Sequence, residues 1–334
     1  MKAALYRRYG PASVVTVGEM PTPEAGPNDV LIAVEASAVT TADWRFRASA
    51  FPGGMWLLGR LMAGLRGPRQ PVLGRDFAGR IVAVGEEVTQ WRVGQRVFGV
   101  SPGMGAHAEM LALPESAPMV ELPDGADPAE AAALPFGAMS ALSFLRDIAA
   151  LQPGERVLIT GASGGVGAYA VQIARHLGAE VTAAAGPGRA ALLHGLGAAR
   201  VADYTAGPVA RRGDGYDVIL DTVGSLGFAQ ARGALAPRGR FVPLEFSLGD
   251  VGRALAARLR GGQRMLLGIA PDRREDLIAV ADLWQAGALR PVIDARMPLA
   301  QIADAHARVE GRHKTGSLVI EIAGTAPTAA PAAA

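Results

Sequence analysis

The stretch RVLITGASGGVGAYAVQIARHLGA, residues 156–179, combines a short apolar run, a glycine-rich turn and an amphipathic segment in immediate succession. The run at 157–159 is typical of a buried central strand in a parallel sheet. The apolar spacing over 171–177 predicts a helix on that sheet, and residues 180–185 predict the next strand. The order strand, turn, helix, strand indicates a doubly wound parallel sheet in an α/β protein.

The turn itself carries a nucleotide-binding pattern. From Ala162 it reads A-S-G-G-V-G, the dinucleotide fingerprint with alanine at the first glycine. Gly164 would let the backbone approach a pyrophosphate, and Gly167 would let helix and strand pack closely. The free N–H groups at the start of the helix would bind the anion. We therefore predict a dinucleotide site; the alternative is a glycine turn with a structural role alone.

The loop after the second strand indicates which dinucleotide is bound. An acidic residue there would bind the ribose 2′-hydroxyl of NAD(H), but no carboxylate lies between Glu180 and Asp203. The loop reads GPGRAALL, and Arg189 is its charged residue. Because a guanidinium binds phosphate oxygens in pairs, Arg189 favours NADP(H) over NAD(H). The alternative is a solvated arginine at the start of a helix.

Composition limits the remaining classes. The 334 residues are 50% hydrophobic and 19% charged, which suits two domains with buried cores. The net charge of +2 and the lack of basic runs interleaved with aromatic residues argue against nucleic-acid binding. The absence of cysteine excludes disulfides, thiolate catalysis and cysteine-ligated metals. No apolar run reaches the roughly 18 residues of a membrane span, so we expect a cytoplasmic protein with no membrane partner.

The pattern of predicted elements changes twice along the chain. Residues 1 to about 120 contain short β-branched runs broken by glycine and proline, which predict an antiparallel β domain. Helical and strand-like segments then alternate, with strands expected at 218–223 and 239–244, each after a helical segment. Two β-like runs near the C-terminus would return to the first domain. We predict a β domain at 1–122 and 290–323, a nucleotide-binding domain at 123–289 and a disordered tail at 324–334.

The segment FPGGMWLLGRLMAGLRGPRQ, residues 51–70, does not fit this pattern. As a helix it would be apolar around most of its circumference, so we expect it to be buried against another part of the molecule. Our first hypothesis is that residues 51–65 form a lid over the active cleft and contact an apolar substrate. The alternatives are a dimer contact or a packing helix.

These motifs together resemble a known family. The chain resembles the zinc-independent medium-chain dehydrogenase/reductases, in the quinone oxidoreductase and enoyl reductase branch. The resemblance implies a GroES-like β domain, completed by the C-terminal segment, with a Rossmann domain inserted. The motifs that carry it are LGRDFAGRIVAVGEEVTQWRVGQRVFG (73–99), AAALPFGAMSAL (131–142), LQPGERVLITGASGGVGAYAVQIAR (151–175), LDTVG (220–224) and VEGRHKTGSLVIEI (309–322).

The comparison also shows what is missing for a metal site. Zinc-dependent relatives place a cysteine and a histidine–glutamate pair where this chain has Thr40 and Arg75–Asp76. The cysteine-rich structural zinc lobe is absent too, so we expect no metal. The histidines are scattered singly with no metal spacing: His107, His176, His194, His306 and His313.

The resemblance assigns residues to the catalytic end of the cleft. Thr40, Thr41 and Ser140 would line the nicotinamide or substrate end, and Asp43 and Arg45 follow on the same loop. We take Thr40, Asp43 and Arg45 as the catalytic candidates, and Thr41 and Ser140 as contacts of the cofactor. Arg45 would orient an acceptor oxygen; the alternative is a surface ion pair with Asp43.

The same resemblance assigns residues to NADP(H). The pyrophosphate turn is matched by Ser163, Gly164, Gly165 and Val166, and the 2′-phosphate position by Arg189. Tyr204 would pack beside the adenosine phosphate, and Val223 and Gly224 would lie against the ribose and nicotinamide. Lys314 would contact the cofactor from the C-terminal segment.

Without a metal, the expected acceptor of a hydride is a conjugated enone or a quinone, because hydrogen-bond donors can stabilise the developing enolate. We therefore expect an NADPH-dependent reductase of an apolar carbonyl or quinone. Two alternatives remain open: an enoyl-thioester reductase that uses the arginines of 60–75 to meet a carrier, and an NADP(H)-binding sensor without turnover. We also expect a homodimer joined through the strand FVPLEF, residues 241–246.

Overall fold

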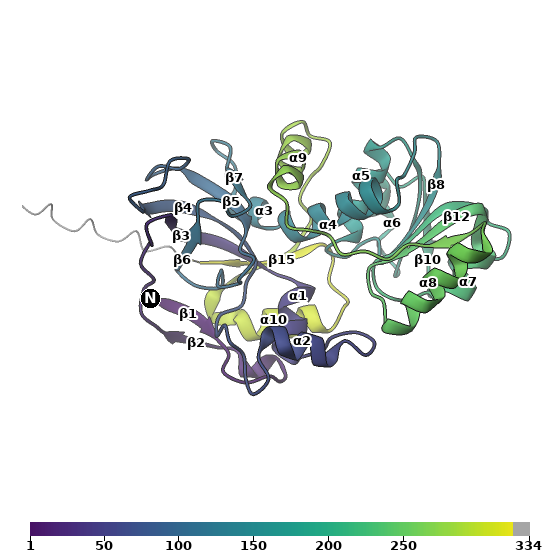
Figure 1. Cartoon of the computed structure of the whole chain (residues 1–334). Helices are drawn as coiled ribbons and strands as arrows, with labels where there is room; N and C mark the ends of the chain where they lie inside the picture. The colour runs from purple at the N-terminus through teal and green to yellow at the C-terminus, as the bar shows by residue number, and fades with distance from the viewer. Residues whose placement is uncertain (323–334) are drawn as a thin grey trace, which may run out of the picture.

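The computed structural model describes residues 1–322, so the prediction for the tail at 324–334 lies outside the described residues. Figure 1 shows two lobes, one containing the N-terminal strands together with the yellow C-terminal strand, the other teal and green. Each lobe is built on its own sheet, one with six strands and one with seven. The predicted combination of a GroES-like β domain and a Rossmann domain is confirmed.

The teal and green lobe contains the predicted parallel sheet. Its strand order is β10-β9-β8-β11-β12-β13, and β8, which holds the apolar run 157–159, pairs with β9 and β11. Helix α5 follows the glycine turn directly, as predicted. The strands are β8 (Arg156–Thr160), β9 (Glu180–Ala185), β10 (Arg200–Asp203), β11 (Tyr216–Asp221), β12 (Leu235–Pro243) and β13 (Arg264–Met265). The helices are α5 (Gly167–His176), α6 (Ala190–Leu196), α7 (Phe228–Ala234), α8 (Leu248–Arg260) and α9 (Arg274–Gln285).

Two details of this sheet differ from the prediction. Residues 204–215, between β10 and β11, form turns and no helix, so β11 is not preceded by the expected helical segment. The segment 241–246 is not an edge strand, because β12 lies between β11 and β13. The edge next to β12 is the two-residue strand β13, which is too short to leave a recognisable sequence pattern, and the opposite edge is β10.

The other lobe is a largely antiparallel sheet with the order β14-β15-β3-β4-β5-β7, and β6 also pairs with β3. The C-terminal strand β15 pairs with β3, which confirms that the end of the chain returns to the first sheet. Only β14 and β15 run parallel within this sheet. The strands are β3 (Asp29–Val39), β4 (Asp76–Val84), β5 (Arg96–Val100), β6 (Met110–Pro114), β7 (Met119–Glu121), β14 (Ile293–Pro298) and β15 (Ser317–Glu321), with β1 (Lys2–Leu5) and β2 (Thr16–Glu19) as a separate pair.

A nearly continuous helical segment joins the lobes. Asp127 caps its first helix by accepting a hydrogen bond from Ala129 N at 2.9 Å. One hydrophobic core contains Phe98 from the first lobe, Leu134 from this segment and Val157 from the second lobe. The two sheets are therefore held together by shared apolar packing. The segment consists of α3 (Pro128–Ala132), the π-turn η2 (Pro135–Met139), α4 (Ser140–Leu142) and the π-turn η3 (Ser143–Ile148).

The expectation that residues 51–70 are buried is wrong. Helix α2 covers only Trp56–Ala63, and most of its large apolar side chains are exposed. The buried residues of α2 are the small ones, Gly59 and Ala63. There is no room for a larger side chain at Gly59, because even a Cβ there would overlap the ring of Phe51. The other elements of this lobe are η1 (Ala12–Val14), α1 (Thr41–Ala48), η4 (Leu299–Gln301) and α10 (Ile302–Glu310).

No helix within residues 1–322 is both long enough and apolar enough to pass through a bilayer.

Candidate active site

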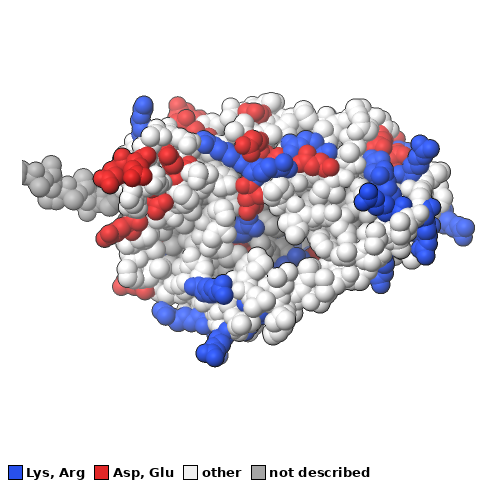
Figure 2. Space-filling model, in the orientation of Figure 1, with Lys and Arg blue, Asp and Glu red and all other residues white. Residues whose placement is uncertain are grey.

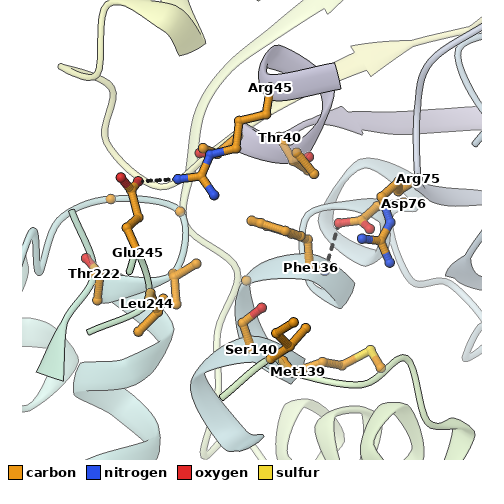
Figure 3. Close-up of a pocket in the computed structure, with 18 of the residues that line it drawn as sticks. Thr40, Arg45, Arg75, Asp76, Phe136, Met139, Ser140, Thr222, Leu244 and Glu245 are labelled. Atoms are coloured by element: carbon orange, nitrogen blue, oxygen red, sulfur yellow. Dashed lines mark hydrogen bonds and ion pairs between the residues drawn. The ribbon is translucent and has the colours of Figure 1, made fainter. Parts of the chain in front are cut away.

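A cavity of about 470 Å³ lies where the two lobes meet, and Figure 3 shows its central residues. One end is formed by the glycine turn, through Gly164, Gly165 and Val166. The other walls are mostly apolar. They include Phe51, Met55, Leu58, Met62, Phe136, Met139, Phe144, Leu244 and Phe246.

The glycine turn has the close approaches that the fingerprint requires. A Cβ on Gly167 would overlap the carbonyl oxygen of Gly161 and lie 2.7 Å from Ala162 Cα, so only glycine allows α5 to start this close to β8. A Cβ on Gly164 would have Gly161 O as its nearest neighbour, at 3.2 Å, and the outer side of Gly164 faces the cavity. The turn therefore presents backbone to a bound group, which fits a pyrophosphate.

The C-terminal segment completes this end of the cavity. Gly316 N donates a hydrogen bond to Ser163 O at 2.7 Å, which fastens the segment onto the turn. Lys314 Nζ donates to Gly316 O and lies 2.9 Å from where a Cβ on Gly165 would stand. Burial lowers the pKa of Lys314 to about 8, with Asp294 acting in the opposite direction. A cation beside the turn suits a phosphate ligand.

Replacing Lys314 with glutamine should raise the KM for NADPH and NADH alike, because the pyrophosphate is common to both. We expect an effect of about 10- to 100-fold, as for one charge-assisted hydrogen bond. The wild-type KM should also rise as the pH increases through about 8, because the lysine loses its charge there. Steady-state kinetics across pH measures both effects, with Lys314→Arg as the control that stays charged. An unchanged KM in Lys314→Gln would contradict this role.

Arg189 and Tyr204 both lie outside the cavity, each after one of two adjacent strands. Strands β9 and β10 are paired in parallel with Ala185 opposite Asp203, so the residues that follow each strand are neighbours. The Tyr204 hydroxyl is 3.0 Å from where a Cβ on Gly186 would stand, and Tyr204 is exposed. Arg189 is half-buried at the start of α6 and forms no ion pair with residues 1–322. Both side chains are thus available at the carboxyl ends of adjacent strands.

A buried carboxylate organises the loop that follows β11. Asp221 Oδ1 accepts hydrogen bonds from Thr160 Oγ1 at 2.6 Å and from Val223 N at 3.2 Å, and its Oδ2 accepts from Leu226 N. Val223 lines the cavity, while Gly224 follows it with φ of +69°. Asp221 was part of the LDTVG motif but was not predicted as a site residue. Its position as the last residue of a buried apolar strand is the signal that would have identified it.

Asp43, predicted as a catalytic candidate, does not line the cavity. It is fully buried, and its Oδ2 accepts hydrogen bonds from Thr40 N at 2.7 Å and from Thr40 Oγ1 at 2.6 Å. Its Oδ1 accepts from Gly74 N at 2.8 Å, so the carboxylate is used to cap α1 and to hold the neighbouring loop. Thr40 does line the cavity, but its hydroxyl proton is already directed to Asp43.

Arg45 pairs with a residue from the other lobe. Its Nη2 lies 2.6 Å from Glu245 Oε1, so the expected alternative of a pair with Asp43 is wrong. Figure 3 shows this ion pair at one side of the cavity. Glu245 also binds Arg312, and both arginines line the cavity. Thr41 and Ser140 line it as well, and no hydrogen bond to residues 1–322 engages their hydroxyls. These two hydroxyls are therefore free to donate hydrogen bonds into the cavity.

Asp76, which was expected only as a replaced zinc ligand, lines the cavity as well. It is buried; Oδ2 accepts a hydrogen bond from Phe136 N at 2.8 Å, whereas Oδ1 has no hydrogen-bond partner among the described residues. Burial raises the pKa of Asp76 to about 8, although the Phe136 hydrogen bond and the charge of Arg75 oppose the shift. Asp76 is therefore mostly protonated at neutral pH.

This raised pKa makes Asp76 a source of pH-dependent stability. Between its ordinary value near 4 and its folded value near 8 the folded protein holds a proton that the unfolded chain releases, so its contribution falls as pH rises. Asp76→Asn imitates the protonated acid and should remove that decline. At pH 8 we expect the variant to melt higher, by about 1–2 °C for each kcal/mol recovered, and at pH 5 the difference should shrink. Thermal unfolding at both pH values measures this, and a pH-independent difference would contradict it.

The residues at the positions where zinc-dependent relatives place ligands contact other groups of the protein. Thr40 is bound to Asp43, Arg75 is paired with Asp272, and Asp76 is bound to Phe136 N. No group of three His, Cys, Asp or Glu side chains within residues 1–322 could hold a metal ion. The histidines are less scattered than the sequence suggested, because the buried rings of His107 and His306 meet edge to face, 5.8 Å between centroids. Burial lowers the pKa of both, so they pack as neutral rings.

Known families match both parts of the chain. The family model described as "Alcohol dehydrogenase GroES-like domain" matches residues 26–124, and the one described as "Zinc-binding dehydrogenase" matches residues 196–320. The quinone oxidoreductase of Pseudomonas aeruginosa is 32% identical over 336 residues, which cover 96% of this chain and 99% of that protein.

Two solved structures agree with this match over 96% of the chain. The CurK enoyl reductase is 25% identical, with a TM-score of 0.82 and 99% of its own chain covered. Mycobacterial Rv1454c, solved in complex with NADPH, is 25% identical, with a TM-score of 0.79 and 100% of its chain covered. The chain therefore belongs to the medium-chain dehydrogenase/reductase superfamily, in its quinone oxidoreductase branch.

Proposed function

We propose that this protein is a metal-free, NADPH-dependent reductase of quinones or α,β-unsaturated carbonyl compounds. The observation that carries the proposal is the cavity itself, which begins at the glycine turn and continues between apolar walls. A nucleotide held at the turn would direct its nicotinamide into a space suited to an apolar acceptor. The relatives named a quinone oxidoreductase and an enoyl reductase, and the NADPH complex of a third, support this class of reaction.

The chain offers a group for each part of the cofactor. The turn residues Ser163 to Val166 and Lys314 would hold the pyrophosphate, and Arg189 with Tyr204 would hold the 2′-phosphate and the adenosine. Val223 and Gly224 would lie beside the ribose and nicotinamide. The preference for NADPH rests on the unpaired guanidinium of Arg189 and on the absence of a carboxylate between Glu180 and Asp203.

For hydride transfer the protein would supply hydrogen-bond donors and an apolar binding space. Bound NADPH supplies the hydride. The hydroxyls of Thr41 and Ser140 would donate hydrogen bonds to the acceptor carbonyl, where negative charge develops as the hydride arrives. The apolar walls would hold the acceptor in place and exclude water, which reduces the entropic part of the barrier. We propose a metal-free reaction because the chain lacks a set of zinc ligands at the usual positions.

The test is NADPH oxidation with three kinds of acceptor: simple quinones, short enones and a crotonyl thioester. Turnover with quinones or enones and not with the thioester is expected. Turnover with the thioester alone would favour the enoyl-thioester alternative, which the likeness to CurK enoyl reductase keeps open. Tight NADPH binding without turnover on any acceptor would favour the sensor alternative. Equal turnover after dialysis against a zinc chelator is expected for a metal-free enzyme.

We also propose that the protein works in the cytoplasm as a homodimer. The position of β13 at the free edge of the parallel sheet makes that edge the candidate for pairing with a second copy. Light scattering gives the molecular mass in solution, and a monomeric mass at micromolar concentration would contradict the dimer.

A further inference from the structure

Helix α2 exposes an apolar surface that nothing in the described chain covers. Six large side chains in one ten-residue stretch are 47–63% exposed, which is unusual for residues of this type in a folded protein. We call this set the α2 surface. It consists of Trp56, Leu57, Leu58, Leu61, Met62 and Leu65.

Unpaired positive charge surrounds the α2 surface. Residues 44–75 contain six arginines and no Asp or Glu. Arg45, Arg47 and Arg75 pair with carboxylates from elsewhere in the chain. The other three arginines, which lie at or after α2, form no ion pair with residues 1–322. The N-terminal segment adds two more, because Tyr9 Oη donates to Gly64 O and Tyr6 N donates to Pro71 O. The five arginines without an ion pair to residues 1–322 are Arg7, Arg8, Arg60, Arg66 and Arg69.

The arrangement around α2 is that of a helix lying in a membrane interface. The guanidinium of Arg60 stands 3.9 Å from the Tyr9 ring centroid and 5.6 Å from that of Trp56, so its charge is held at the side of the apolar face. Arg66 and Arg69 follow the helix directly and are exposed. Figure 2 shows the edge that Figure 1 labels α1 and α2 as white surface next to blue side chains. Bulky apolar residues flanked by arginine bind where acyl chains meet anionic headgroups.

The α2 surface is continuous with the cavity. Leu58 and Met62 belong to the exposed surface and also line the cavity, together with Met55 and Gly59 from the same segment. Leu248 N, at the start of α8, donates to Gly53 O at 3.1 Å, so the segment reaches across to the other lobe at the mouth of the cavity. An apolar acceptor could pass from a bilayer to the cavity along apolar side chains.

We propose that the α2 surface docks on an anionic lipid membrane and that the cavity takes its apolar acceptor from there. This second part rests on the proposed function; the docking itself does not. The observations favour a bilayer over a second copy or an acidic carrier protein, because a bilayer matches both the bulky apolar face and the unpaired arginines beside it. The expectation of no membrane partner was based on the lack of a spanning segment, which an interfacial helix does not need.

The experiment is co-sedimentation of the full chain with vesicles, either pure phosphatidylcholine or phosphatidylcholine containing phosphatidylglycerol. We expect binding to the anionic vesicles that weakens as salt rises, and about ten-fold less on the neutral ones, because each nearby arginine adds to the attraction. The fluorescence of Trp56, the tryptophan most exposed to solvent, should shift to shorter wavelength on binding. No binding to either vesicle would overturn the proposal.

The decisive variant is Leu57→Glu/Leu61→Glu, because neither residue lines the cavity. It should bind anionic vesicles at least about ten-fold more weakly, because two leucines that would be buried in the membrane are lost and two negative charges are gained. The matched control is Leu259→Glu on α8, which is 80% exposed and about 16 Å along that helix from the contact with Gly53. The control should bind as the wild type does. Equal binding by the double variant would overturn the proposal.

Two further measurements separate the outcomes. NADPH oxidation with a short water-soluble quinone should be unchanged in Leu57→Glu/Leu61→Glu, so loss of vesicle binding is not confused with loss of folding or of the proposed activity. Light scattering of both proteins shows whether the α2 surface joins two copies instead. Two results would overturn the membrane assignment. One is a dimer that is lost in the double variant. The other is an acidic carrier protein that, at an equimolar amount, displaces this protein from the vesicles.

Discussion

Gly167→Ala should cost about 3 kcal/mol of stability, because the new Cβ meets backbone that has no room to move. It would overlap the carbonyl oxygen of Gly161 and come 2.7 Å from Ala162 Cα, so either α5 or the end of β8 must shift. That loss corresponds to a melting temperature lower by about 4–6 °C in a chain of 334 residues. Thermal unfolding measures it, and cofactor binding should fall with it because the turn moves.

Gly164→Ala is the matched control for this prediction. The nearest atom to a new Cβ on Gly164 is Gly161 O at 3.2 Å, so the backbone must shift by only a few tenths of an ångström and the loss of stability should be smaller than in Gly167→Ala. The methyl group would still stand between the backbone and a pyrophosphate, so the affinity for NADPH should fall while the melting temperature stays within about 2 °C. Similar melting temperatures for the two variants would contradict the geometry of the turn.

Arg189→Ala should raise the KM for NADPH by about 10- to 100-fold and leave the use of NADH nearly unchanged. Its guanidinium has no ion pair within residues 1–322 and follows the strand where the 2′-phosphate is expected, so it is free to bind that group. The range corresponds to about 1.5–3 kcal/mol for a charge-assisted hydrogen bond. Steady-state kinetics with both cofactors measures the effect.

Arg200→Ala is the control for Arg189→Ala. Arg200 lies on the adjacent strand β10, is 65% exposed and pairs with Glu180, so its loss should change neither KM. Equal losses with NADPH and NADH in Arg189→Ala would place the arginine elsewhere on the cofactor and remove the argument for NADPH specificity.

The parts of the fold that follow from local pattern were predictable. The run 157–159, the glycine turn and the spacing of α5 are each read within one element, and the structure confirms all three. The return of β15 to the first sheet was also expected, because its β pattern reappears after the last helix. These features depend on periodicity and turn chemistry, which a single sequence contains.

The errors concern partners that are distant in the chain. Asp43 is a catalytic candidate because it follows Thr40 and Thr41 on the same loop. Its hydrogen bond from Gly74 N spans 31 residues, so no local pattern shows that its carboxylate also holds this distant loop. Glu245 was missed for the same reason, because its importance comes from two arginines on other elements. The exposure of Trp56–Ala63 was not predictable either, since an apolar helix has the same sequence pattern whether protein or lipid covers it.

The bond from Gly316 N to Ser163 O has a consequence for synthesis of the chain. During translation the parallel sheet can form once β13 has left the ribosome, but the turn at 163–165 waits for residues some 150 positions later. Strand β3 waits longer still, because its partner β15 pairs Val39 with Leu318. A nascent chain halted before residue 316 would therefore contain the nucleotide fold without a finished nucleotide site.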